Sequence, residues 1–175
     1  MRRLTLALLS GALAVGLVAG PVAAKQPDKS GMNIVDKALQ IRDATGEFST
    51  LIALVENLGL VDALSARGQL TVFAPTDQAF FDAFGITAED VPALVTSATR
   101  ASLTDVVLYH VAKGNRDAGE VLGSSQIRML NGDFAMVNAS LMPPTIDGAP
   151  ITGANAAYAS NGIIHVVGAV LDPNS

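Results

Sequence analysis

The stretch Thr71-Val72-Phe73-Ala74-Pro75-Thr76-Asp77-Gln78-Ala79-Phe80 changes from a strand pattern to a helix pattern at its centre. Its first half, with Leu70 before it, is apolar on both alternating faces, which is typical of a strand covered on both sides of a sheet. Pro75 lacks the N–H needed to extend the strand ladder. Thr76 is a favourable N-cap, and Asp77 places negative charge in the first turn of the next helix. The stretch therefore predicts a buried central strand that leads directly into a helix.

The segments on either side of this stretch have helical spacing. Apolar residues recur every three or four positions through 48–58 and again through 103–110. Gly59 ends the first of these helices, as glycine commonly does. Thr87 followed by Asp90 three residues later resembles a capping box and predicts another helix start. The front half of the chain is therefore predicted to be mainly helical.

Beyond Gly123 the turn residues are those of β-hairpins. Asn131-Gly132, Asp147-Gly148 and Asn161-Gly162 each tolerate the positive φ angles of a tight turn. Residues 163–167, Ile-Ile-His-Val-Val, are almost all β-branched and predict a second buried strand. Helices in the front half and strands in the back half predict an α+β fold.

Residues 1–24 predict a cleavable secretory signal peptide. Arg2-Arg3 gives a positive start, and an uncharged, largely apolar run follows it. Val22-Ala23-Ala24 then supplies the small residues that a signal peptidase requires. We therefore predict cleavage between Ala24 and Lys25.

The alternative for this segment is an uncleaved membrane anchor, because its apolar run approaches the roughly 20 residues that span a bilayer. Pro21 and the polar residues that follow favour cleavage. Residues 25–31 are predicted to be a flexible leader, and 32–175 a single domain. We expect a secreted or periplasmic protein whose membrane contact would require retention of the signal segment.

Composition excludes several classes of function. Removal of residues 1–24 takes away two arginines and no acidic residue, so the formal charge changes from −5 to −7. Such an acidic protein is not expected to bind nucleic acid. The chain contains no cysteine, which excludes disulfides, thiol catalysis and cysteine metal sites.

Three separated segments resemble the sequence boxes of the fasciclin I domain family. They are 71–80, Leu108-Tyr109-His110-Val111 and Asn161-Gly162-Ile163-Ile164-His165-Val166-Val167, in the family's order and spacing. The resemblance extends from about residue 34 to residue 173. It implies a wedge of two short β-sheets packed with an N-terminal group of helices. Asp77 stands where many relatives carry Asn, and Gly168 where an acidic residue often follows the last box.

The resemblance also implies a non-enzymatic protein that acts in cell–cell or cell–matrix contact. Its partner would be a protein or glycan of a cell surface or matrix. The family's adhesion motif falls on Tyr109 and His110, which are therefore the predicted partner-binding residues. An exposed patch is expected around Tyr109 and residues 113–117. The alternative is that Tyr109 and His110 are core residues, since Leu108 and Val111 flank them.

Some relatives bind carotenoids, so the resemblance supports a second function, the carriage of an apolar small ligand. Two sets of apolar side chains could line its groove or form an adaptable surface, against the alternative that they are simply core. These sets are Phe80, Phe81 and Phe84, and Met129, Met136 and Met142 with Leu141.

The sequence offers little for catalysis. It contains no nucleophile elbow, His-Glu-x-x-His pair, phosphate loop, dinucleotide fingerprint or calcium loop, so we predict no catalytic residue and no cofactor. His110 and His165 lie among apolar residues and are expected to bond backbone carbonyls or neighbouring side chains in the core. They could also bind zinc or iron together with Asp77 or Asp105. No ligand spacing supports that alternative, and we predict no metal site.

Overall fold

The computed structural model describes residues 31–66 and 68–173. The predicted signal peptide, its cleavage point between Ala24 and Lys25 and the leader up to residue 30 lie outside the described residues. The helices are α1 (Ile34–Thr45), α2 (Ser49–Leu58), α3 (Val61–Ser65), α4 (Asp77–Phe84), α5 (Val91–Leu94), α6 (Arg100–Tyr109) and α7 (Ala118–Leu122). The strands are β1 (Leu70–Pro75), β2 (Val111–Lys113), β3 (Gln126–Arg128), β4 (Phe134–Asn138), β5 (Thr145–Ile146), β6 (Ala149–Ala159) and β7 (Gly162–Val167). The predicted α+β class is confirmed.

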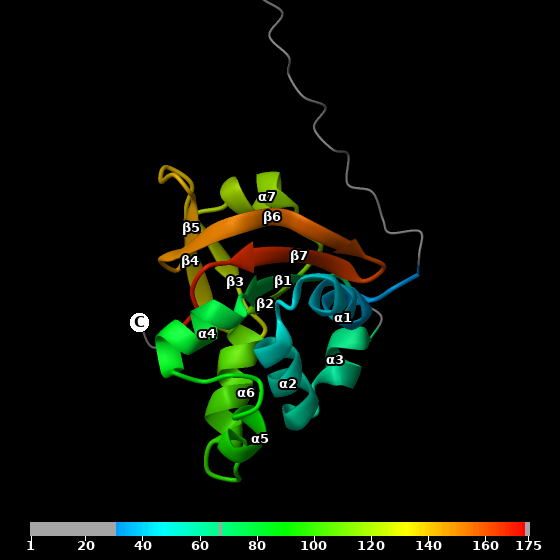
Figure 1. Ribbon diagram of the computed structural model, residues 1–175. Coiled ribbons are helices and arrows are strands. Elements are labelled where there is room, and N and C mark those ends of the chain that lie inside the picture. The colour runs from blue at the N-terminus through cyan, green and yellow to red at the C-terminus, as the bar shows by residue number, and fades with distance from the viewer. Residues whose placement is uncertain (1–30, 67, 174–175) are drawn as a thin grey trace, which may run out of the picture.

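The strands of the described residues form a seven-stranded sheet in the order β2-β1-β7-β6-β5-β4-β3. β1 and β7 are parallel, and the other neighbours are antiparallel. The two expected short sheets are the two arms of this order, joined through β6 (Figure 1). The ends of the order meet again, because Met129 forms an isolated bridge with Ala112 and the Leu130 N–H donates to Val111 O at 2.7 Å. The sheet is therefore curled rather than flat.

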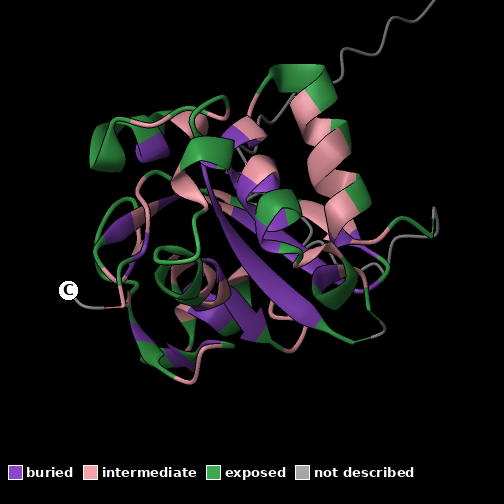
Figure 2. Ribbon diagram, turned by 90° about the horizontal axis from the view of Figure 1, so that it is seen from below, coloured by how far each residue is buried: buried purple, intermediate pink, exposed green. Residues whose placement is uncertain are grey.

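This curl gives the molecule two apolar cores, which β1 and β7 separate. Leu70, Val72 and Ala74 of β1 pack in the core shared with helices α1, α2 and α6. Phe73, between them in sequence, packs in a second core with residues of β3 to β6. Buried positions follow the central strands, and exposed positions lie on the outer turns (Figure 2). The predicted burial of β1 on both faces is confirmed, and so is that of β7 except at Val166, which is partly buried.

Among the helices of the described residues, none is long and apolar enough to cross a membrane. The helices α1 to α6 gather on one side of β1 and β7, whereas α7 lies on the other side (Figure 1). The helix predicted to begin at Thr87 begins later, at Val91. One bond of the expected capping box is present, since the Asp90 carboxylate accepts from the N–H of Thr87 at 2.8 Å. The Thr87 hydroxyl donates to the same carboxylate at 2.8 Å, and the Asp90 N–H bonds the backbone oxygen of Thr87. These bonds close a turn before the helix.

The three predicted turns differ from one another. Asp147 and Gly148 have φ angles of 49° and 76°, so the predicted tight turn between β5 and β6 is confirmed. At Asn131-Gly132 only Gly132 has a positive φ angle. The loop there is longer than predicted, because Met129 N–H bonds Asp133 O at 2.8 Å and closes it.

The third predicted turn, Asn161-Gly162, is wrong in its position. Gly162 is already the first residue of β7, and neither residue has a positive φ angle. Glycine is required here for another reason, since a Cβ atom at this position would lie 2.0 Å from the carbonyl oxygen of Leu70. The absence of a side chain lets β1 and β7 approach at the start of their pairing.

Asn161 joins three elements at the start of β7. Its side-chain oxygen accepts from the N–H of Ile34 at 2.8 Å, at the beginning of α1. Its amide nitrogen donates to Leu64 O at 2.8 Å and to Ala66 O at 3.2 Å, at the end of α3. Asn161 is buried, so these bonds satisfy groups that water does not reach.

Asp77 joins α4 to α2. Thr76 caps α4 as predicted, since its hydroxyl oxygen accepts from Ala79 N–H at 3.2 Å. The Asp77 carboxylate instead accepts from Ser49 N–H at 3.0 Å and Thr50 N–H at 2.7 Å, in the first turn of α2. The N-cap of α2 is Phe48, whose side chain makes no capping bond. A carboxylate from another helix therefore caps α2.

We expect Asp77→Ala to lower the free energy of unfolding by about 2 kcal/mol, because two helix N–H groups lose a charged acceptor. Asp77→Asn should have a smaller effect, since the amide keeps one acceptor oxygen. The measurement is urea denaturation followed by circular dichroism. Asp82→Ala on the exposed face of α4 is the control, and an equal loss in that variant would contradict the cross-helix cap.

Candidate functional site

The predicted partner-binding residue Tyr109 is the last residue of α6, and only 3% of its surface is exposed. Its ring lies in the core enclosed by the curled sheet. The hydroxyl donates to the Asp147 carboxylate at 3.0 Å, with Phe134 O also within reach at 3.3 Å. Burial raises the pKa of Tyr109, and the bond to Asp147 raises it further. Tyr109 therefore holds the β5–β6 turn and the start of β4 against α6.

His110, the second predicted partner-binding residue, is buried at the end of α6. Its Nδ1 donates to Val106 O at 2.7 Å. Its Nε2 accepts from Leu171 N–H at 2.9 Å, which fixes the neutral tautomer with the proton on Nδ1. Burial lowers the pKa of His110 to about 4. The ring thus ties the C-terminal segment to α6.

His165 has the opposite tautomer. Its Nε2 donates to Arg116 O at 2.9 Å, and its Nδ1 accepts from Asn155 N–H at 3.1 Å. Its ring stacks on Phe73, with 5.5 Å between the ring centres. Burial lowers the pKa of His165, whereas the bond to the Arg116 carbonyl and the charge of Asp117 oppose that effect. The expectation that both histidines bond backbone groups inside the core is confirmed.

Tyr109 and His110 are both buried, which confirms the alternative prediction that they are core residues. An exposed patch centred on Tyr109 is wrong, because the curled sheet covers the ring, and His110 is 1% exposed. Contact of Tyr109 and His110 with a partner stays a prediction, and it would require the covering strands to open. In the structure, Tyr109 binds the β5–β6 turn and His110 binds the C-terminal segment.

The metal-site alternative has little support in the geometry. Both ring nitrogens of His110 and His165 already bond backbone groups, and the Asp77 carboxylate caps α2. Within residues 31–66 and 68–173 no three histidine, aspartate or glutamate side chains are grouped to hold a metal ion.

The exposed apolar side chains lie elsewhere, on the β3–β4 hairpin and the loop that follows β4. Residues of β4 alternate, with Ala135 inside the second core and Phe134 and Met136 outside. We define the β4 surface as the large apolar side chains exposed here: Leu130 (38%), Phe134 (52%), Met136 (58%), Leu141 (48%) and Met142 (94%). Met129 was expected to belong to such a surface, but it is buried because it bridges to β2.

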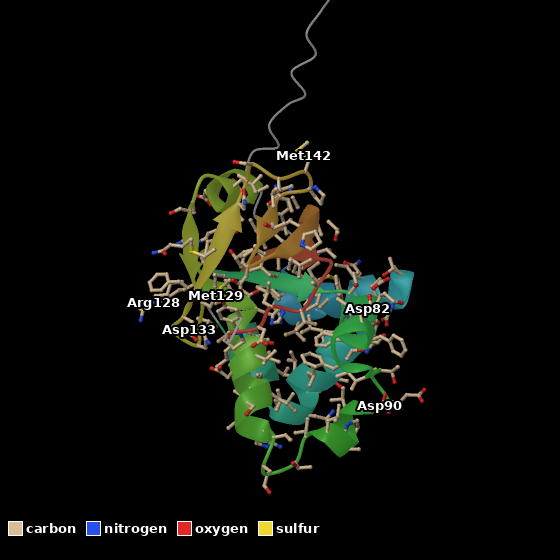
Figure 3. All side chains as sticks on the ribbon, turned by 90° about the vertical axis from the view of Figure 1, so that its left-hand side faces the viewer. Asp82, Asp90, Arg128, Met129, Asp133 and Met142 are labelled. Carbon is tan, nitrogen blue, oxygen red and sulfur yellow. The ribbon has the colours of Figure 1, made fainter. Side chains whose placement is uncertain are left out.

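Phe134 and Leu130 were not predicted as surface residues. The sequence could have indicated the exposure of Phe134, because side chains alternate along a strand and Phe134 and Met136 therefore lie on one face and Ala135 on the other. Arg128 lies opposite Phe134 in the β3–β4 register, with its guanidinium carbon 5.9 Å from the centre of the Phe134 ring. Figure 3 shows Arg128 at one end of this hairpin and Met142 at the far end of the following loop.

A separate apolar groove of about 320 Å³ runs between α2, α4, α5 and α6. Phe80 and Phe84 line it, as expected, whereas Phe81 does not and points outward with 54% of its surface exposed. The remaining lining residues are Leu54, Ile86, Leu94, Ser102, Leu103, Val106 and Val107. The groove could hold a small apolar molecule or one end of a longer one.

We expect the free energy of unfolding to fall as the pH decreases from 6.5 towards 4. In this window the unfolded histidines are protonated, whereas burial keeps His110 neutral in the folded protein. Each such histidine contributes a slope of up to about 1.4 kcal/mol per pH unit. Urea denaturation between pH 7 and pH 5 measures it. His110→Gln should have a shallower slope than the parent, and parallel slopes would contradict the assignment.

The chain matches the Fasciclin domain model over residues 46–173. It is 34% identical to Protein sll1483 of Synechocystis over 152 residues, which cover 87% of this chain and 79% of that protein. It is 27% identical to the transforming growth factor-beta-induced protein ig-h3 of Sus scrofa, over 77% of this chain but 19% of that protein.

One solved structure that resembles the chain is the FAS1 domain pair of the insect cell adhesion molecule fasciclin I. The TM-score is 0.45 at 16% identity, over 82% of this chain and 46% of that chain. The family model spans more than half of the sequence, including all three boxes that pack β1, α6 and β7 together. The chain therefore belongs to the fasciclin domain family.

Proposed function

We propose that this protein is a non-enzymatic, exported surface-binding domain that contacts a cell-surface or matrix component through the β4 surface. The observation that carries the proposal is the concentration of exposed apolar side chains there. Eight large apolar side chains of the described residues are exposed, and five of them lie between Leu130 and Met142. Exposed apolar patches of this kind mark interaction sites.

The chemistry of these residues suits contact with a partner. Met136 and Met142 have flexible, polarisable side chains that adapt to different surfaces. Phe134 is more rigid, since the hairpin and Arg128 hold it. Phe134 and Met136 lie two residues apart on the same face of β4, so a rigid aromatic side chain stands beside an adaptable methionine, as is common at binding surfaces.

The proposed export rests on the predicted signal peptide. The deep burial of both histidines supports a non-enzymatic role, because neither ring is available as a general base at the surface. Membership of the fasciclin domain family supports a role in contact rather than catalysis.

We expect the double variant Met136→Gln, Met142→Gln to bind cells or matrix of its natural host at least about 10-fold more weakly than the parent, since polar side chains of similar length replace the apolar contact. Binding of the labelled chain to whole cells and extracted matrix measures this. The control is Phe81→Gln, which removes an exposed apolar side chain from α4, outside the β4 surface. Equal binding by parent and double variant would overturn the proposal.

A second candidate function, the carriage of an apolar small ligand such as a carotenoid, is supported by the groove beside α4. Its volume of about 320 Å³ lies near the lower limit of ligand pockets. A long ligand would therefore project from it, and the exposed Phe84 ring would cover part of its length.

This candidate predicts that the protein purified from its natural host carries an extractable apolar compound, seen as a visible absorption band if it is a carotenoid. We expect Phe84→Ser to lower the bound amount several-fold, because Phe84 forms one wall of the groove. Phe81→Ser, on the same helix but outside the groove, is the matched control. Equal ligand content in both variants would contradict carriage in this groove.

A further inference from the structure

A depression of about 400 Å³ lies where the two ends of the sheet order meet. Its lining is unusual for this acidic chain because it contains three cationic side chains. We define the basic pocket by its lining residues, Lys113, Arg116, Arg128, Met129, Leu130 and Gly132. They come from β2, the loop after it, β3 and the β3–β4 turn.

The three cations form no ion pair within the described residues. The lysines and arginines of the described residues are these three and Lys37, Arg42 and Arg100. The latter have polar partners, at Gln40 (3.3 Å), Asp43 (2.9 Å) and the carbonyls of Leu58 and Asn57 (3.1 and 3.2 Å), respectively. Half of the described cations therefore gather at one depression without a counter-ion.

The arginines of the pocket do not use all of their donors within the described residues. Arg128 uses its Nε for a 3.3 Å bond to Gly132 O, and no hydrogen bond within the described residues involves its terminal nitrogens. The Nε of Arg116 is buried without any hydrogen-bond partner. A buried donor without a partner costs free energy. A negatively charged oxygen ligand in the pocket would compensate the positive charge of the Arg116 guanidinium group.

The nearby carboxylates have other partners. Asp117 accepts from Glu120 N–H at 3.0 Å as the cap of α7. Asp133 accepts from the Asn131 amide at 2.7 Å within the β3–β4 turn. They moderate the positive potential of the pocket but do not form salt bridges with its cations.

We infer that the basic pocket binds a carboxylate or sulfate group of an acidic polysaccharide. Guanidinium groups bind such oxyanions through paired donors, and the lysine adds a point charge. Lys113 and Arg128 are exposed, so the site is open and a polymer chain could pass through it. The inference rests on the proposed surface-binding function and names the chemistry of its partner.

A lipid surface is less well matched. An anionic membrane would engage cations and protruding apolar side chains together. Met142, the most exposed apolar side chain of the described residues, lies away from Arg128 (Figure 3). The apolar side chains next to the cations are Leu130, which is 38% exposed, and Phe134, whose ring is covered by Arg128, and they suit the flat apolar face of a sugar ring beside its charged group.

The test is isothermal titration of the protein with oligogalacturonate, which carries carboxylates, and with a heparin oligosaccharide, which carries sulfates. Uncharged dextran, sodium sulfate and phosphatidylglycerol vesicles are the comparison probes. We expect at least one acidic oligosaccharide to bind, dextran not to bind, and the affinity to fall as NaCl screens the charges. Lys113→Gln and Arg128→Gln should each weaken binding about 10-fold.

Arg42→Gln is the matched control, because it removes the same charge at a distant, locally paired site. If Arg42→Gln weakened oligosaccharide binding as much as Lys113→Gln and Arg128→Gln, the basic pocket would not be the binding site. No binding of either oligosaccharide, equally tight binding of free sulfate, or binding of vesicles alone would overturn the polysaccharide inference. Suppose that Lys113→Gln and Arg128→Gln bind the oligosaccharides as tightly as the parent, whereas the double variant Met136→Gln, Met142→Gln no longer binds cells. In that case only the polysaccharide inference fails. If that double variant binds cells normally, the proposed function fails.

Discussion

The parallel pairing of β1 with β7 is the contact on which the rest of the structure depends. It joins segments about 90 residues apart, in the register Leu70↔Gly162 to Pro75↔Val167. Each strand faces the helices on one side and the enclosed sheet core on the other. Pairing therefore has to form before either core is complete. It requires that Gly162 lack a side chain, since any Cβ there would collide with the Leu70 carbonyl.

Buried polar side chains then tie the remaining segments to this pair. Asn161 holds α1 and α3 at one end, and His110 and His165 hold the C-terminal segment and the Arg116 loop. Thr71 accepts from Arg116 N–H and donates to Gly114 O, both at 2.8 Å. Each of these bonds joins segments far apart in the sequence. A single unsatisfied member would leave a buried group without a partner, which is why such residues specify one arrangement of the loops.

The sequence predicted the elements whose signals are local. The double-sided apolar pattern of β1, the Thr76 cap and the Asp147-Gly148 turn were all readable from neighbouring residues. Helix α7 was not predicted, because its five residues are too short for a periodic pattern. Its capping box of Asp117 and Glu120 is nevertheless a local sequence signal for a helix start. What sequence could not show were contacts closed by tertiary folding. The Asp77 cap on α2, the return of Met129 to β2 and the bond of Tyr109 to Asp147 all depend on segments brought together by the sheet.

The three family boxes lie mainly in the interior, whereas the surfaces proposed to bind a partner lie outside them. The residues of those boxes fill the two cores or bond backbone groups, so they explain why this chain folds as a fasciclin domain. Among the residues of these boxes only Gln78 is exposed. Five of the eight exposed large apolar side chains of the described residues, and the three cations of the basic pocket, lie instead between Lys113 and Met142, in β2, the hairpin and their loops. None of these side chains belongs to β1 or β7. A fold stabilised from within can therefore present different surfaces, and the partner of this protein is to be sought in the chemistry of that outer segment.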